Sequence, residues 1–333
     1  METLPNERVR LTHAEAQALG EQALRRIGYH ADEAKIIADH CIDAGLCGYE
    51  YSGLPKILNV AEHKRLKSPR RPMSIMHETP ISTQFDGGNN NGMITMFRAT
   101  QAVIEKASRS GFAVVGVNNS WMSGRSAYYV EMAARAGLIA IHSVSSHLHV
   151  AAPGSKGAAT GTNPVAFGFP TEHEPFVIDL GTSAFMGTDL IFRERTNALL
   201  PDNVALDADG NATRDASKVA VLLPFGGYKG FALSLAMQAM GLFASGGLSA
   251  DRVYGYMIMA MKPDLLTPMD QFRRDMSAML ARVKATPRQP GVEEIRLPGE
   301  RSQQERARLR REGLEIDLKI YEALRDLPQG KLP

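Results

Sequence analysis

Apolar residues in the N-terminal region recur at the 3.6-residue spacing of an amphipathic helix. The first such stretch begins at Thr12, which forms a capping box with Glu15, and it ends near Gly28. A second helix follows and ends towards Gly45 or Gly48. The pattern therefore predicts two N-terminal helices, each with one apolar face to bury.

The central part of the chain alternates short apolar runs with helical stretches. The short runs are rich in β-branched and aromatic residues, which favours strands over turns of helix. We predict strands over 113–117, 138–141, 164–169, 176–180 and 256–261, and helices over 93–110, 127–135, 229–243, 269–285 and 302–327, the last interrupted at Gly313. The centre is therefore mixed α and β, between helical ends.

A glycine-rich dinucleotide fingerprint is missing from this pattern. No Gly-x-Gly-x-x-Gly lies between a strand and a helix with an acidic residue about twenty positions further on. The segment 114–120 begins inside the first predicted strand of the central part, and it lacks that glycine spacing. If the chain binds a nicotinamide cofactor, it therefore does not hold it in the usual doubly wound way.

The charge balance excludes some classes of partner. The 333 residues include 38 Lys and Arg against 36 Asp and Glu, so the net charge is +2. This balance does not support nucleic acid or an anionic membrane as the main partner. The most apolar stretch, 231–248, is interrupted by Ser234, Gln238 and Ser245, so we expect a buried helix and not a membrane span.

Two cysteines, Cys41 and Cys47, lie six positions apart in one predicted helix. This spacing does not favour a disulfide, so we expect buried free thiols in a reducing cytoplasm. The first residues carry no cationic-then-apolar signal pattern, which also indicates a cytoplasmic protein.

Three loops of small residues, 161–164, 178–183 and 224–230, each carry one or two strongly polar side chains. The first, Gly-Thr-Asn-Pro, can present backbone N–H groups to a phosphate or a carboxamide, or can be a plain turn before a strand. Asp179 ends an apolar strand and can bind a ribose hydroxyl, steer a proton or cap the following turn. Lys229, at a helix start, suits a phosphate, although a surface lysine often occupies such a position.

In order and spacing these loops resemble the malate/L-lactate dehydrogenase family of NAD(P)-dependent oxidoreductases. That family also includes ureidoglycolate dehydrogenase, diketogulonate reductase and piperideine-2-carboxylate reductase. The family's Pro-x-Gly-x-x-Lys-Gly is matched in full by Pro224, Gly226, Lys229 and Gly230, and the resemblance extends from about Leu11 to Leu327. It implies a non-Rossmann α/β (α+β) fold with a largely antiparallel central sheet, flanking helical segments and a homodimer.

The resemblance also implies which residues contact the cofactor, NAD or NADP. These are Ser123, Ser146, Thr162, Asn163, Pro164, Asp179, Leu180, Gly181, Lys229, Gly299 and Glu300.

The chain departs from the family where substrate and protons meet. The family reads Gly-x-x-Ser-His-Gly-x-x-Arg, and this chain has Tyr51 for the Ser, Ser52 for the His and Lys56 for the Arg. A second family His falls in the stretch 121–124, Trp-Met-Ser-Gly, and is also absent. We expect Lys56 or the following Arg125 to hold a substrate carboxylate, although Lys lacks the bidentate fork of Arg.

Another group must then handle protons, because loss of a general acid–base costs a rate factor of about 10² to 10⁴. The candidates are Tyr51, Ser52, Asp179 and His147 with its neighbour His149. Alternatively, the substrate accepts hydride without a strong acid from the protein, as a cyclic imine that is already protonated does. The two histidines have no third ligand at motif spacing, so we expect no metal.

Two functions remain open. The first is an NAD(P)H-dependent reductase of a small 2-oxo acid or cyclic imine carboxylate, or the reverse oxidation. The second is a cofactor-binding family member that has lost dehydrogenase activity or catalyses a different reaction. We expect a helical segment over 1–80 that packs with 300–333, and a mixed α/β domain over 81–299 that binds cofactor and substrate.

Overall fold

A seven-stranded sheet forms the centre of the protein, seen here in a computed structural model that describes all residues except 1, 5–6, 250–251, 253 and 328–333. Neighbouring strands are antiparallel except β4 and β5, which are parallel. In spatial order the strands are β10 (Phe176–Leu180), β9 (Val165–Phe169), β6 (Ile139–Ser145), β13 (Gly255–Met261), β5 (Phe112–Asn118), β4 (Ser82–Asp86) and β3 (Ser74–Thr79). The expected largely antiparallel, non-Rossmann α/β architecture is confirmed.

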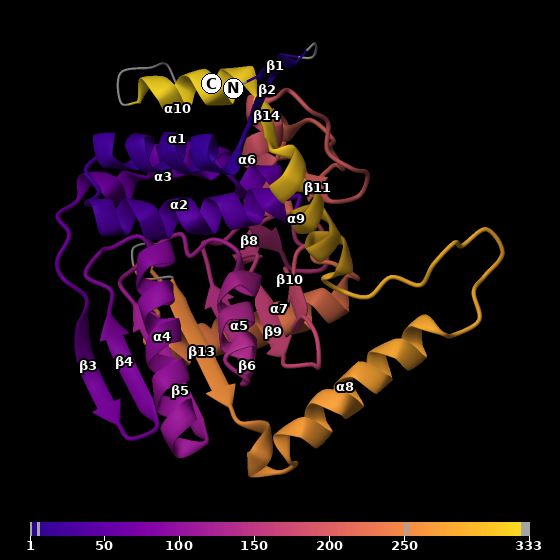
Figure 1. The fold of residues 1–333 in the computed structure, drawn as a ribbon. Helices are drawn as coiled ribbons and strands as arrows, with labels where there is room; N and C mark the ends of the chain where they lie inside the picture. Colours follow the sequence, from indigo (N-terminus) through magenta and orange to yellow (C-terminus); the bar gives the residue numbers. More distant parts are fainter. Residues whose placement is uncertain (1, 5–6, 250–251, 253, 328–333) are drawn as a thin grey trace.

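Helices cover both faces of this sheet (Figure 1). Helices α4 (Gly92–Ser110) and α5 (Ser126–Arg135) pack on one face, and α7 (Tyr228–Phe243) packs on the other. The alternation of side chains along β6 explains both contacts, since Ala140 and Val144 join the core under α5 while Ser145 lies against α7.

A helical layer lies across one end of the sheet (Figure 1). Its core combines buried residues from 9–60 with residues from 314–327. It consists of α1 (His13–Arg26), α2 (Ala31–Leu46), α3 (Pro55–Glu62), α10 (Leu318–Asp326) and a small sheet of β1 (Glu2–Leu4), β2 (Arg8–Leu11) and β14 (Leu314–Asp317). Strand β3 lies within 1–80 but pairs with β4, so the division into 1–80 and 81–299 stays a proposal.

The prediction of one interrupted helix over 302–327 is wrong in its middle. Helix α9 (Glu300–Glu312) ends at Gly313, and β14 then pairs with β2 before α10 begins. Gly313 has a φ of 91°, and a Cβ there would lie 2.8 Å from the carbonyl oxygen of Leu11. The glycine therefore ends the helix and lets the chain enter the sheet beside β2.

A second small sheet, of four strands, follows the end of β6 along the chain. Its core contains Val150, Leu200 and Leu222, and Leu190 packs there from α6 (Gly187–Arg195). In spatial order its strands are β11 (Ala205–Leu206), β12 (Val221–Leu222), β7 (Val150–Ala151) and β8 (Ala158–Thr160).

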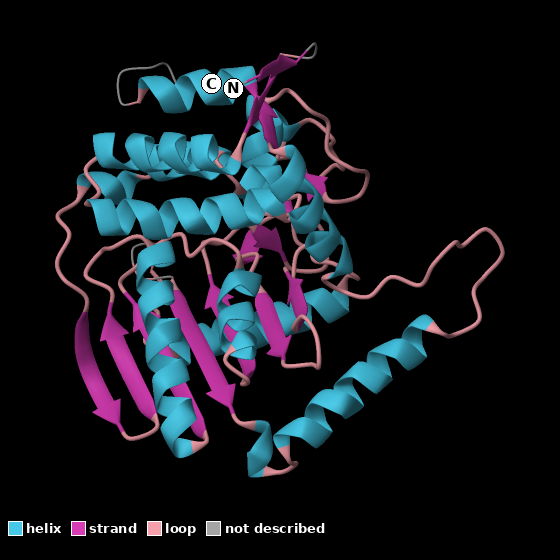
Figure 2. Cartoon of the chain, in the orientation of Figure 1, coloured by secondary structure: helices cyan, strands magenta, loops and turns pink. Residues whose placement is uncertain are grey.

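Helices α7 and α8 (Met269–Lys284) are more exposed than their apolar residues suggest. Figure 2 shows α8 projecting from the body, and every one of its residues is exposed or half-buried. The expectation that 231–248 forms a buried helix is wrong, because Leu235, Leu242 and Phe243 of α7 are 49%, 44% and 67% exposed. Within the described residues, no helix is long and apolar enough to cross a membrane.

Candidate active site

Lys56 enters the interior from the start of α3. Pro55 occupies the first turn of this helix, where its missing N–H costs nothing. The Lys56 side chain is only 5% exposed, and its Nζ donates a hydrogen bond of 3.2 Å to Oγ1 of Thr188 on α6. Among the described residues, no carboxylate forms an ion pair with Lys56. Burial lowers the pKa of Lys56 to about 8.

Arg125 is the N-cap of α5 and lies close to α2. The preceding Gly124 has a φ of 78°, and a Cβ there would lie 2.1 Å from Nε2 of His40. This close approach lets the backbone N–H of Arg125 donate a hydrogen bond of 2.7 Å to that Nε2. The Arg125 guanidinium forms an ion pair with Asp43 of α2. The arginine is therefore held by both its backbone and its side chain.

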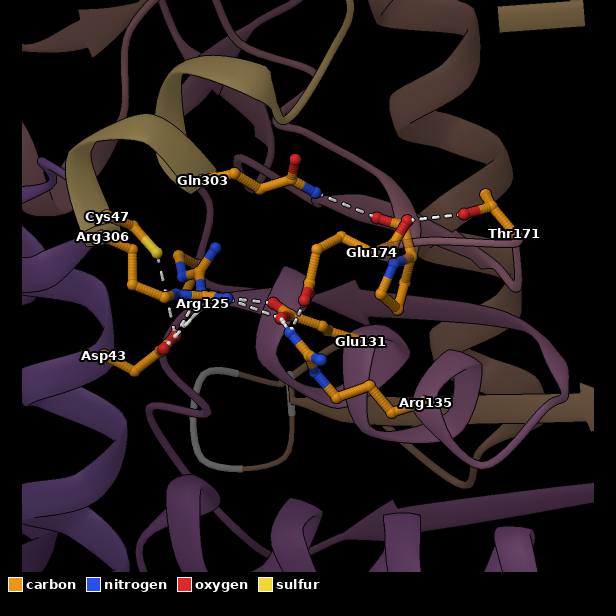
Figure 3. Close-up of polar contacts among 10 residues, drawn as sticks. Asp43, Cys47, Arg125, Glu131, Arg135, Thr171, Glu174, Gln303 and Arg306 are labelled. Atoms are coloured by element: carbon orange, nitrogen blue, oxygen red, sulfur yellow. Dashed lines mark hydrogen bonds and ion pairs between the residues drawn. The ribbon is translucent and has the colours of Figure 1, made fainter. Parts of the chain in front are cut away.

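A network of charges extends from this ion pair to helix α9 (Figure 3). Asp43 also pairs with Arg306 of α9 at 3.2 Å, and Arg306 pairs with Glu131 of α5 at 2.6 Å. Burial raises the pKa of Glu131, but hydrogen bonds and charge from Arg306 and Arg135 outweigh burial and lower it to about 2. Ion pairs thus connect helices α2, α5 and α9 next to Arg125.

Asp179 comes from the end of β10 and reaches the start of α5. Its Oδ2 accepts a hydrogen bond of 2.7 Å from the backbone N–H of Ala127, in the first turn of that helix. Surrounding protein raises the pKa of Asp179, while this hydrogen bond and the charge of Arg125 oppose the rise. The side chain is nevertheless open to the cavity described next, so the carboxylate is not sealed from water.

Two adjoining cavities bring these residues together. A smaller one, of about 150 Å³, is lined by Tyr51, Ser52, Lys56, Arg125, Asp179 and Gly181, among others. A larger one, of about 530 Å³, is lined by Ser123, Ser146, His147, His149, Thr162 and others. Both cavities share Lys56, Gly124, Pro164, Met186 and Thr188 in their walls. Lys56 and Thr188 therefore lie at the junction of the two spaces.

The three small-residue loops meet beside these cavities. The backbone N–H of Thr182 donates to the carbonyl of Thr162 at 2.9 Å, which joins the first loop to the second. The N–H of Phe225 donates to the carbonyl of Thr182 at 3.1 Å, which joins the third. Backbone hydrogen bonds thus join segments that are about sixty residues apart in sequence.

Residues 11–325 match the family described as malate/L-lactate dehydrogenase. The chain belongs to the malate/L-lactate dehydrogenase family. The malate dehydrogenase of Pyrococcus abyssi is 30% identical over 321 residues, which cover 88% of this chain and 87% of that protein. The family acts on hydroxy and oxo acids, so the chain is an NAD(P)-dependent oxidoreductase.

Two solved structures show how closely the fold of this dehydrogenase follows its relatives. A dehydrogenase from Sinorhizobium meliloti is similar with a TM-score of 0.87 and 27% identity, over 95% of this chain and 97% of that one. The delta1-piperideine-2-carboxylate reductase from Pseudomonas syringae pvar. tomato has a TM-score of 0.81 and 25% identity, over 95% of this chain and 99% of that one.

In this dehydrogenase, Asn163 of the Gly-Thr-Asn-Pro loop is fully buried behind the larger cavity. Its Oδ1 accepts a hydrogen bond of 3.0 Å from the backbone N–H of Ser146, and its Nδ2 donates to Ser234 and Gln238 of α7. The amide therefore fixes the end of β6 against α7. Its neighbours Thr162 and Pro164, by contrast, line the cavity.

Besides Asn163, four predicted cofactor residues line neither cavity in the described part of the dehydrogenase. Leu180 is half-buried in β10, and Lys229 is exposed at the start of α7. Gly299 packs against the backbone of Val177, and Glu300 forms an ion pair of 2.5 Å with Lys284. Their part in cofactor binding stays a prediction.

The histidines of the larger cavity are held neutral. Burial lowers the pKa of His147 and His149 below the ordinary value. A third histidine of this cavity, His63, was not among the predicted site residues. Its ring stacks on Trp121 at 4.2 Å, and burial lowers its pKa to about 4. Among the described residues, no group of three or more His, Cys, Asp or Glu is placed to hold a metal ion.

Thr188 and Met186 are two further cavity residues that sequence reasoning missed. They follow Asp179 by only a few residues, but the sequence gives no sign that α6 turns back over the site. The two cysteines are free and buried, as expected.

Proposed function

We propose that this dehydrogenase is an NAD(P)H-dependent reductase of a small 2-oxo acid or cyclic imine carboxylate, able to run the reverse oxidation. One observation carries the proposal: Lys56, Arg125 and Asp179 line one cavity of about 150 Å³. Two cations attract a substrate carboxylate, and the small volume suits a small molecule. The likeness to a malate dehydrogenase and to delta1-piperideine-2-carboxylate reductase supports both substrate classes.

The larger cavity suits the nicotinamide end of NAD or NADP. Its volume of about 530 Å³ falls within the range of small-molecule sites, and Ser123, Ser146 and Thr162 offer hydroxyl groups. When bound, the nicotinamide supplies or accepts the hydride. Because the two cavities adjoin at Lys56, a substrate in the smaller one lies next to the larger one.

The loop 224–230 suits the cofactor's phosphates. Gly226 and Gly227 have φ values of 54° and 60°, and the space that a Cβ would occupy is open at both. An anion can therefore approach this backbone closely, beside Lys229 and the N-terminus of α7. Lys229 is exposed, which leaves its ammonium available for this contact.

We also propose that two copies of the chain associate through α7. Leu235, Leu242 and Phe243 form an exposed apolar face on this helix, which monomeric proteins rarely leave uncovered. A second copy packed there gives the homodimer that the family resemblance implies. Residues 224–230 run into the first turn of the same helix, so the dimer contacts and the cofactor loop then share α7.

Turnover tests the proposal directly. The purified protein is mixed with NADH or NADPH and a panel of 2-oxo acids and cyclic imine carboxylates, and loss of nicotinamide absorbance is followed. We expect oxidation of one cofactor with at least one member of the panel. Cofactor binding without any turnover favours the alternative, a family member with lost or changed chemistry. Ser52 and Met122, at positions where the resemblance places histidines, are the observation behind that alternative.

A further inference from the structure

The proposed reduction needs a proton donor, and this inference rests on that proposed function. A 2-oxo acid that receives a hydride at its carbonyl carbon becomes an alkoxide unless its oxygen takes up a proton. The donor must be protonated near neutral pH, close to the substrate, and able to give its proton away. The titratable groups that line the two cavities differ in how well they meet these three conditions.

The cavity histidines do not meet the first condition, protonation near neutral pH. With lowered pKa values, His63, His147 and His149 are neutral imidazoles near pH 7. A neutral imidazole N–H is a very weak acid. The phenol of Tyr51 is weaker as a donor than an ordinary tyrosine, because burial raises its pKa.

Arg125 and Asp179, the other charged groups of the smaller cavity, are less suited to donate a proton. Arg125 remains protonated throughout the physiological range, so it binds anions but does not transfer protons. Burial raises the pKa of Asp179, but the N–H of Ala127 and the charge of Arg125 both favour its carboxylate form, which takes up protons and does not donate them. Arg125 can therefore act as a carboxylate anchor, and its ion pair with Asp43 leaves further N–H groups of the guanidinium for that purpose.

Lys56 alone among these residues meets all three conditions. Its ammonium lies at the junction of the two cavities, where hydride donor and acceptor would meet. It has three N–H donors, and Thr188 accepts one at 3.2 Å. A buried ammonium without a carboxylate partner among the described residues is poorly stabilised, which favours release of its proton.

We propose that Lys56 is the proton donor of the reduction, and that Arg125 holds the substrate carboxylate. As hydride reaches the carbonyl carbon, the C–O π electrons move to oxygen, which forms a bond to a proton from Nζ. The substrate is reduced to a 2-hydroxy acid, the nicotinamide is oxidised, and Lys56 is left as a neutral amine. The amine regains a proton from water through the cavity. In the oxidation, the amine takes the hydroxyl proton.

The titration of Lys56 depends on the groups around it. On its own side of the site lie Tyr49 and Tyr51, and Cys41 and His40 face it from α2. Across the cavities lie Arg125, Asp179, Asp189, Glu194, His63, His147 and His149. A bound substrate carboxylate adds a negative charge and moves the pKa of Lys56 upward from about 8, which keeps it protonated until transfer.

Replacement of Lys56 by arginine distinguishes a proton donor from a carboxylate anchor. Lys56→Arg keeps the positive charge and restores the residue that the family resemblance places there, but guanidinium does not give up a proton. If Lys56 donates the proton, kcat for the 2-oxo acid falls about 10² to 10⁴-fold while KM changes little. If Lys56 only anchors the carboxylate, Lys56→Arg keeps kcat, and that result overturns the proposal. The matched control is Lys67→Arg, at an exposed lysine outside both cavities, with unchanged kinetics expected.

A second measurement does not depend on turnover or on the variant's folding. Wild-type protein with ¹³C at lysine Cε is titrated by NMR without cofactor, and the resonance missing from Lys56→Arg is assigned to Lys56. We expect a midpoint near 8 for Lys56, and a midpoint near 10.5 overturns the donor role. A wild type that turns over only cyclic imines also overturns it, because their nitrogen arrives protonated. A wild type that reduces nothing in the panel instead defeats the proposed function itself.

Discussion

The guanidinium of Arg125 forms an ion pair with the carboxylate of Asp43, and this pair joins the site to the helical layer. Both side chains are largely buried, at 10% and 18% exposure. Asp43 also receives Arg306 from α9, so one carboxylate lies between two arginines. The position of the proposed carboxylate anchor is therefore set by α2 and α9 as well as by its own helix.

Neutralising that carboxylate is expected to loosen the anchor. Asp43→Asn leaves two buried arginines with one fewer countercharge, and loss of one partner of a buried pair costs about 3 to 5 kcal/mol. We expect a loss of that order in urea unfolding and a raised KM for the carboxylate substrate. Asp39→Asn, one turn earlier in an exposed pair with Lys35, is the control and should cost about 1 kcal/mol or less. Equal losses in the two variants would show that Asp43 has no special role.

Burial of the charged Lys56 side chain is expected to lower the free energy of unfolding, and replacement by a neutral side chain should raise it again. A pKa of about 8 instead of 10.5 means that the folded state disfavours the ammonium by about 3 kcal/mol. This penalty is fully present below pH 8, because both states are then protonated. It fades as pH rises towards 10.5, because only the unfolded state still binds the proton.

We therefore expect Lys56→Met to raise the free energy of unfolding at pH 7 by up to about 3 kcal/mol. The gain should shrink steadily between pH 8 and 10.5. Urea unfolding across this pH range measures it, with Lys67→Met as the exposed control. A Lys56→Met protein that is less stable than wild type at pH 7 contradicts the cost of burial.

Lys229 is expected to act on cofactor affinity alone. Removing a charge-assisted contact to a phosphate costs about 1.5 to 3 kcal/mol, so Lys229→Ala should weaken NADH or NADPH binding roughly 10 to 100-fold. Because Lys229 is exposed, its loss should leave the thermal melting temperature nearly unchanged. The control is Lys319→Ala on α10, also exposed. If Lys229→Ala binds the cofactor as tightly as wild type, the loop 224–230 does not bind the cofactor's phosphates.

The apolar face of α7 is expected to hold two copies together. Leu235→Arg places a charge in the middle of that face, and we expect it to convert the dimer into a monomer in light scattering after size exclusion. Leu266→Arg is the control, because Leu266 is 96% exposed before α8 and lies off this face. A wild type that is monomeric at all concentrations refutes the interface.

Local patterns predicted much of this fold because they depend on neighbouring residues. The capping box at Thr12 opens α1, and the predicted strand 256–261 matches β13 within one residue. The error at Gly313 arose because β14 exists only through pairing with β2, three hundred residues away in sequence. The exposure of α7 escaped prediction for a similar reason, since apolar composition does not say whether the same chain or a partner covers a helix.

The candidate site was predictable in its residue types but not in its electrostatics. The sequence pointed to Lys56, Arg125 and Asp179, and all three line one cavity. It did not show that Lys56 is buried beside Thr188, because α6 lies far along the chain. It also missed His63, since the stacking on Trp121 joins α3 to a loop after β5. Charge states depend on such distant contacts.

The central claim is that a nicotinamide cofactor binds in the cavity beside Lys56, and Trp121 offers a direct probe of it. Trp121 is the only tryptophan of the chain, and it stacks on His63 in the wall of the larger cavity. Titration with NADH and with NADPH should quench its emission, with energy transfer to the reduced nicotinamide and saturation at one cofactor per chain. Emission that stays unchanged with both cofactors, in a folded protein, would contradict the claim.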